Sequence, residues 1–132
     1  MMKLLVRRLA AMSHDPPEEA PMIVSRKALP STRDSVTHKF TVDRHEGYLT
    51  IGLYPDGKPG EIFLKVAKEG SALSGFCQAF CRAFSLAMQH GLSVEEAVAR
   101  FKGMRFEPMG TPSNRDIPDA SSIVDYIARY LE

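Results

Sequence analysis

A change of hydrophobic period near residue 70 is the feature that most constrains the fold of this chain. Between residues 36 and 67, apolar and polar residues alternate, which is typical of half-buried β-strands. Two breaks interrupt the alternation, at residues 43–47 and at residues 55–60, and the second break has the proline and glycines of a tight turn. Three strands joined by such short connections predict an antiparallel β-meander.

After this region the apolar residues recur every three or four positions, which predicts three helices. The first has Ser71 as its N-cap and stops at Gly91, the second is capped by Ser93, and the third begins at about Asp119. The predicted fold is α+β, with a three-stranded antiparallel β-meander followed by three helices packed on one face. We expect most of the core to come from these residues: Leu49, Ile51, Leu53, Ile62, Leu64, Val66, Leu73, Phe76, Phe80 and Phe84.

The N-terminal part differs in composition from the rest. Residues 14–30 are rich in proline and charge and show little periodicity, so we assign residues 1–30 to an N-terminal helix with an extended arm or linker, and residues 31–132 to one domain. No apolar run approaches the roughly 20 residues that cross a bilayer, so we expect no membrane contact. Cys77 and Cys81 are poorly placed for a mutual disulfide, which favours a reducing compartment, the cytoplasm.

The corner that opens the first predicted helix has the features of an anion site. Gly70 and Ser71 would present backbone N–H groups and a hydroxyl at a helix start, and Lys65 and Lys68 are close in sequence. The spacing does not match a Gly-x-x-x-x-Gly-Lys-Ser/Thr loop. The structural alternative is an ordinary capped helix start that binds nothing.

The loop at residues 104–118 is the other candidate binding segment. Arg105 is suited to bidentate contact with a phosphate or carboxylate, and Glu107 can accept a hydroxyl proton or pair with that arginine. The alternative is an internal salt bridge between Arg105 and Glu107 that fastens the loop.

No spacing in the sequence completes a catalytic or metal-binding set, so we predict no catalytic residue and no metal site. Cys77 and Cys81 are too few for a closed zinc site and are expected to be small core residues. His38 lies on the core face of its strand, where we expect it to be buried and hydrogen-bonded.

Several blocks between about Leu29 and Leu131 resemble a known family: STRDSVTHKF, HEGYLTIGLYPDGKPGEIFLKVAKEGSALSG, SLAMQHGLSVEEAVARFKGMRFEPMG and IPDASSIVDYIARYL. They are similar to the TSCPD domain near the C-terminus of adenosylcobalamin-dependent (class II) ribonucleotide reductases. The resemblance implies an accessory α+β domain beside a catalytic barrel that uses a cobalamin-generated thiyl radical. This chain is too short for that barrel and contains neither the Thr-Ser-Cys-Pro-Asp string nor a Cys-x-x-Cys motif. The resemblance therefore transfers no catalytic residue, and it implies that adenosylcobalamin belongs to the parent enzyme.

Two classes of function follow from these observations. The first is a stand-alone accessory or regulatory module that acts in deoxyribonucleotide synthesis by binding the reductase catalytic subunit or a nucleotide. The alternative is a small-ligand or single-stranded nucleic-acid-binding domain, which requires Lys65, Lys68, Arg105 and Arg115 to converge beside an exposed Tyr48 or Tyr54. Lys plus Arg number 17 and Asp plus Glu 16, so no strong positive field supports non-specific nucleic-acid binding. The two edges of the sheet also leave homodimerisation open.

Overall fold

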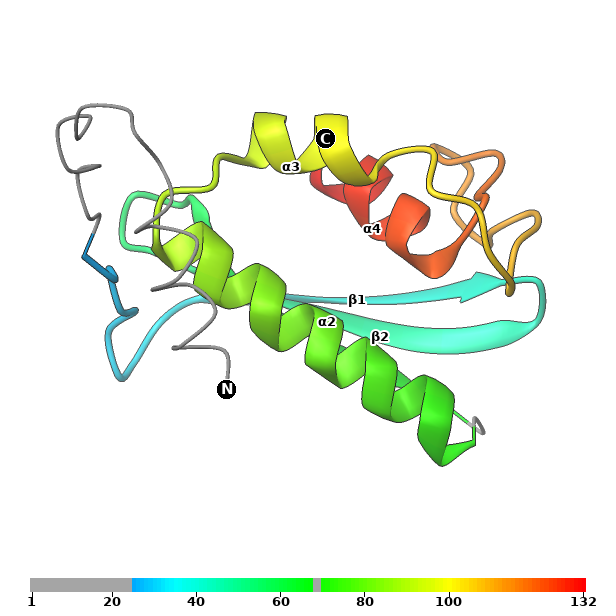
Figure 1. Cartoon of the computed structure of the whole chain (residues 1–132), viewed down its shortest axis with the longest axis horizontal. Helices are drawn as coiled ribbons and strands as arrows, with labels where there is room; N and C mark the ends of the chain where they lie inside the picture. The colour runs from blue at the N-terminus through cyan, green and yellow to red at the C-terminus, as the bar shows by residue number, and fades with distance from the viewer. Residues whose placement is uncertain (1–24, 68–69) are drawn as a thin grey trace, which may run out of the picture.

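The computed structural model describes residues 25–67 and 70–132, with the side chain of Ser71 left out (Figure 1). The strands are β1 (Ser35–Val42), β2 (His45–Leu53) and β3 (Pro59–Val66), paired antiparallel in the order β1-β2-β3. The predicted meander is therefore confirmed. The N-terminal helix and most of the arm predicted within residues 1–30, together with Lys68 and Glu69, lie outside the described residues.

The two hairpin turns differ in how well the sequence predicted them. The first is a two-residue connection, shorter than the break at residues 43–47 suggested, because Asp43 and Arg44 both adopt positive φ angles of 46° and 69°. Such a pair matches the twist of a β-hairpin, so His45 already belongs to β2. In the second turn Gly57 has a φ of 86°, as its glycine predicts, and the Asp56 carboxylate accepts a hydrogen bond from the Lys58 amide.

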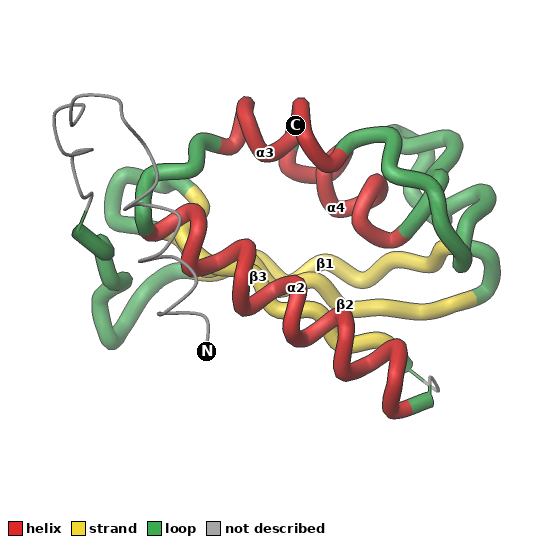
Figure 2. The backbone as a smooth tube through the Cα atoms, viewed as in Figure 1, coloured by secondary structure: helices red, strands yellow, loops and turns green. Residues whose placement is uncertain are grey.

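The helices are α2 (Ser71–Gln89), α3 (Val94–Phe101) and α4 (Ile123–Leu131). Figure 2 shows α2 running alongside β3, and α3 and α4 forming a separate pair near β1. The Ser93 cap of α3 is confirmed, since its hydroxyl accepts from the Glu96 amide at 3.1 Å. None of the helices formed by the described residues is long and apolar enough to span a membrane.

Two predicted helix starts are wrong by a few residues. Gly70 is the N-cap of α2, so Ser71 is its first helical residue and not its cap. The last helix begins at Ile123 with Ser122 as its N-cap, later than Asp119. Its start is delayed because Ala120 exchanges two backbone hydrogen bonds with Gly110, at 2.9 and 3.0 Å, which holds the chain extended.

The buried core joins the sheet to all three helices. The predicted residues that are buried are Leu49, Ile51, Ile62, Leu64 and Phe84. Leu53, Val66 and Phe80 pack against this core from its margin. Phe76, in contrast, is 76% exposed, so its assignment to the core is wrong. The first turns of α2 diverge from α3 and α4 (Figure 1), which accounts for the exposure of Phe76 in this part of the helix.

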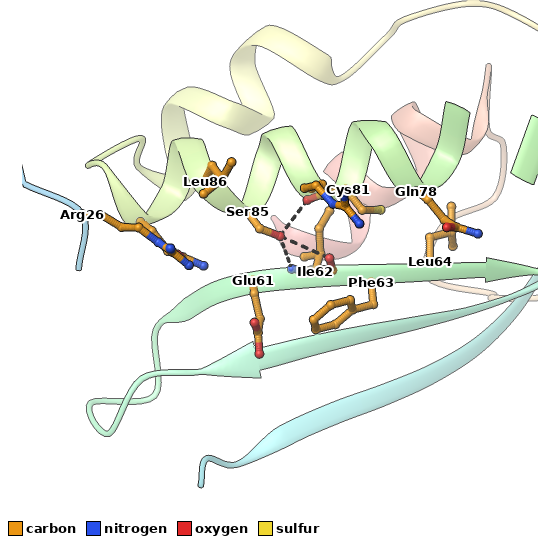
Figure 3. A pocket seen from close by; sticks show the side chains of 11 residues that line it. Arg26, Glu61, Ile62, Phe63, Leu64, Gln78, Cys81, Ser85 and Leu86 are labelled. Atoms are coloured by element: carbon orange, nitrogen blue, oxygen red, sulfur yellow. Dashed lines mark hydrogen bonds between the residues drawn. The ribbon is translucent and has the colours of Figure 1, made fainter. Parts of the chain in front are cut away.

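The second half of α2 protects the free edge of β3. The Ser85 hydroxyl accepts from the Ile62 amide at 2.9 Å (Figure 3). The Gln89 side-chain amide donates to the Gly60 carbonyl at 3.0 Å. The contacts can repeat along both elements, because four residues of a helix rise about 6 Å, which nearly equals the rise of about 6.6 Å for two residues of a strand. Cys81 continues the series against the backbone of Leu64. An edge covered in this way offers no backbone groups to another strand.

Candidate functional site

An apolar groove lies beside the first half of α2. It has a volume of about 260 Å³ and lies between the first half of α2, the segment after α3 and the start of α4. Its walls include the side chains of Leu73, Phe76, Phe80, Phe101, Met104 and Phe106. Three of these remain unusually exposed: Phe76 at 76%, Met104 at 43% and Phe106 at 39%. A cluster of exposed large apolar side chains around a concave surface is typical of an interaction site.

The wall of the groove that carries Met104 is hydrogen-bonded to α4 and its N-terminal flank. The Asp125 carboxylate is fully buried and accepts hydrogen bonds from the Gly103 amide at 2.6 Å and from the Ser121 amide at 3.0 Å. Burial alone opposes ionisation of Asp125, but these bonds and the Arg129 guanidinium at 2.9 Å outweigh it and lower the pKa. The backbone beside Met104 is therefore fastened to the start of α4.

The predicted anion-site residues flank this groove without lining it. Gly70 and Ser71 start α2, and Arg105 is exposed between the two groove residues Met104 and Phe106. The two predicted segments, around Gly70 and around Arg105, thus lie at the same groove, but their apolar side chains form it and their polar ones do not. Among the described residues Arg105 and Glu107 form no ion pair with each other.

The other predicted residues lie elsewhere. Glu107 lines a separate hollow of about 290 Å³ with Asp43 and His45. Lys65 is exposed on the face of β3 that points away from the helices, opposite Tyr48 of β2. Tyr54 is buried, and its hydroxyl donates to the Lys27 carbonyl at 2.6 Å. The groove could have been recognised in the sequence from the large apolar residues that lie next to the two polar segments.

His38 is hydrogen-bonded, as predicted, but it is only half-buried, and the cysteines belong to the core or its margin. The His38 ring nitrogen Nε2 is 2.7 Å from the Tyr126 hydroxyl, and its ring stacks on Tyr130 with centroids 4.1 Å apart. Burial lowers the pKa of His38 and raises the pKa of Cys81 to about 12, so both groups are neutral near pH 7. The described residues contain no group of three or more His, Cys, Asp or Glu side chains that could hold a metal ion.

A second pocket, the α2–β3 pocket, lies on the other flank of α2 and has a volume of about 340 Å³ (Figure 3). Its polar walls come from Arg26, Glu61, Gln78 and Arg82, and Phe63 adds an aromatic wall. The sequence analysis did not identify this pocket, because its arginines are far apart in the chain.

Comparison with known proteins places this fold in a family. The family model of the TSCPD domain matches residues 21–132. The chain belongs to the TSCPD domain family. The resemblance seen in the sequence blocks is thereby confirmed.

The relatives of this TSCPD domain are much longer proteins. It is 57% identical over 106 residues to the vitamin B12-dependent ribonucleotide reductase of Rhodopirellula baltica. The aligned residues cover 80% of this chain and 10% of that protein. The reductases with the same name from Streptomyces coelicolor and Agrobacterium fabrum are 48% and 42% identical, again over 80% of this chain and over 11% and 8% of their own length. The chain therefore spans about a tenth of these relatives. No solved structure matches it significantly.

The relatives are named for vitamin B12, so the described hollows can be compared with that cofactor. Their volumes are about 260 Å³ for the apolar groove, 340 Å³ for the α2–β3 pocket and 290 Å³ for the Glu107 hollow. Each is in or just below the size range of a small-molecule site, and cobalamin is far larger than such ligands. The residues of these hollows do not fit cobalamin, and we assign them no cofactor chemistry.

Proposed function

We propose that this TSCPD domain is an accessory domain of cobalamin-dependent ribonucleotide reduction, which acts in the cytoplasm in deoxyribonucleotide synthesis. In this proposal it binds the reductase through the apolar groove and contributes no catalytic residue. The observation that carries the proposal is the exposure of Phe76, 76% of whose surface is open to solvent beside two further exposed apolar side chains.

The occupant we propose is an apolar segment of the reductase catalytic subunit. In the relatives the matching region is about a tenth of a chain named as a reductase, so the remainder of that chain is attached to the same fold. The groove walls offer aromatic and aliphatic surface and almost no polar group, which suits an apolar side chain as an anchor. Burying one exposed phenylalanine contributes roughly 1.5–3 kcal/mol to association.

Direct binding to the purified full-length reductase of the host tests this proposal. Size-exclusion chromatography and a binding titration should show a complex with the wild-type domain. Phe76→Ser should weaken it at least about tenfold, whereas Phe63→Ser should leave it unchanged, because Phe63 is also exposed, at 55%, but does not line the groove. Absence of a complex with the folded wild-type domain would refute the docking role, and equal effects of the two variants would refute the groove as its site.

A further inference from the structure

We propose that the α2–β3 pocket binds a nucleotide, with Arg26 and Arg82 on its phosphate and Phe63 against its base. This inference goes beyond the docking role, because the pocket and the groove lie on different flanks of α2. The pocket is formed by residues of α2 such as Gln78, Arg82 and Leu86, whereas the groove uses Leu73, Phe76 and Phe80.

The pocket has a surplus of positive charge. The only acidic side chain among its described walls, Glu61, is 8% exposed and is paired with Arg33 at 2.5 Å. The Arg82 guanidinium makes no ion pair or hydrogen bond with any described residue. Arg26 uses its Nε to donate to the Gln89 side chain at 2.7 Å, which leaves its two terminal nitrogens directed along the pocket (Figure 3). Two guanidinium groups that line one pocket match the oxygens of a phosphate group.

The position of Arg26 is fixed by backbone contacts as well. The Lys27 amide donates to the Gln89 carbonyl at 2.8 Å, and the Tyr54 hydroxyl donates to the Lys27 carbonyl at 2.6 Å. The segment is thus fastened to the end of α2 and to β2. An arginine held in place loses less conformational entropy when a ligand binds.

Phe63 supplies a surface for a planar group. It is 55% exposed on the edge strand β3, and its ring stacks on no other aromatic ring of the described residues. A nucleobase can stack on such a ring whatever its identity, because every base has a π-face. Gln78 lines the same pocket, and its Nε2 donates to Ser74 at 3.3 Å, so its carbonyl oxygen can accept from a base or sugar.

The polar group at the floor of the pocket already has hydrogen-bond partners within the chain. The Ser85 hydroxyl is already bonded to the Ile62 amide at 2.9 Å and lies 2.7 Å from the Cys81 carbonyl. The remaining floor is apolar, from Ile62 and Leu64. Specificity must therefore come from the arginine walls and from Phe63. The volume, about 340 Å³, falls within the range of small-ligand sites.

Titration of the full chain tests the inference, with amide NMR shifts and calorimetry as readouts. A ribonucleoside diphosphate should bind saturably and shift the amides of residues 61–64 and 78–86, whereas inorganic phosphate and the free nucleoside should each bind more weakly. Arg82→Gln should lower the affinity for the nucleotide about tenfold. Phe63→Ser should lower it severalfold. Arg100→Gln is the matched control, because Arg100 is exposed on α3 and, among the residues that the structure describes, pairs only with Glu96 at 3.7 Å.

Three results would overturn the inference. One is the absence of saturable nucleotide binding by the folded wild-type chain. Another is equal loss of affinity in Arg82→Gln and Arg100→Gln. The third is far tighter binding of a single-stranded oligonucleotide than of the nucleotide, which would assign the pocket to nucleic acid. Phe76→Ser should still bind the nucleotide, so failure of this inference and failure of the docking role are distinguishable.

Discussion

The two halves of α2 have similar apolar patterns but different surroundings. In the second half, Ser85 and Gln89 bond to the edge of β3, and Phe84 is buried against the rest of the core. In the first half, Leu73 is only half-buried and Phe76 is open to solvent. One half of the helix is thus a structural element whose partners are within the chain. The other half presents the same kind of side chains outward, which is why we assign binding to it.

Truncation of one phenylalanine in each half should give the largest contrast. Phe84→Ala should lower the free energy of unfolding by about 3–5 kcal/mol, because it leaves a cavity among Phe80, Phe101 and the sheet. Phe76→Ala should change it by less than about 0.5 kcal/mol, since its side chain is 76% exposed. Chemical denaturation of both variants measures the difference. Similar losses would show that the two halves are equally buried in solution.

The next largest loss of stability is expected at Asp125, which supports the wall of the groove. Asp125→Ala removes the acceptor of the Gly103 and Ser121 amides and the partner of Arg129, and should cost about 2–3 kcal/mol. The pKa of Asp125 is lower in the folded state than in the unfolded chain, so this stabilisation is present above the ordinary carboxyl range and is lost as the pH falls through the folded pKa. Denaturation of wild type and variant at several pH values measures both effects. Glu96→Ala, in an exposed pair, is the control and should cost less than about 0.5 kcal/mol.

The bond between α2 and the edge of β3 should have a smaller effect. Ser85→Ala leaves the Ile62 amide without its acceptor and should cost about 1–2 kcal/mol. Ser74→Ala is the matched change in the open half of the helix, where the hydroxyl only accepts from Gln78 at 3.3 Å, and should be nearly neutral. Faster amide exchange of Ile62 in the first variant alone would locate the effect at the edge. Equal exchange in both would contradict the protective role of Ser85.

The smallest expected effect is a pH dependence of the free energy of unfolding that comes from His38. Burial lowers the pKa of His38, so the unfolded chain takes up a proton near pH 6.5 while the folded chain does not. The contribution of His38 to stability is therefore complete above this pH and decreases as the pH falls below it. Stability curves between pH 5 and 8 should show this slope in the wild type, and His38→Gln should flatten it. A slope that persists unchanged in the variant would assign the titration to another group.

Much of the fold could be predicted because it depends on local patterns. The alternation in residues 36–67 predicted the three strands, and Ser93 as a cap predicted the start of α3. The two-residue turn was missed because its second residue, Arg44, is not a glycine, and positive φ is uncommon for arginine. The start of α4 was misplaced because a contact with Gly110, distant from the local pattern, keeps Ala120 extended.

The candidate sites were less predictable, for a related reason. The sequence identified the segments around Gly70 and Arg105, and it favoured their polar residues because charges and helix starts have known chemistry. Those polar assignments remain predictions. The apolar groove between the same segments could not be seen, because exposure of Phe76 depends on which neighbours the tertiary structure places over it.

By itself, the sequence determined the order of strands and helices, their approximate limits and the membership of the TSCPD domain family, since periodicity and family motifs are properties of neighbouring residues. Only the tertiary structure decided which half of α2 is covered, and only it brought Arg26 and Arg82 to one pocket. The physical reason is that burial and charge surplus are sums over residues far apart in the chain. A periodic pattern specifies which face of a helix is apolar, but the packing of the other elements determines where that face is left open.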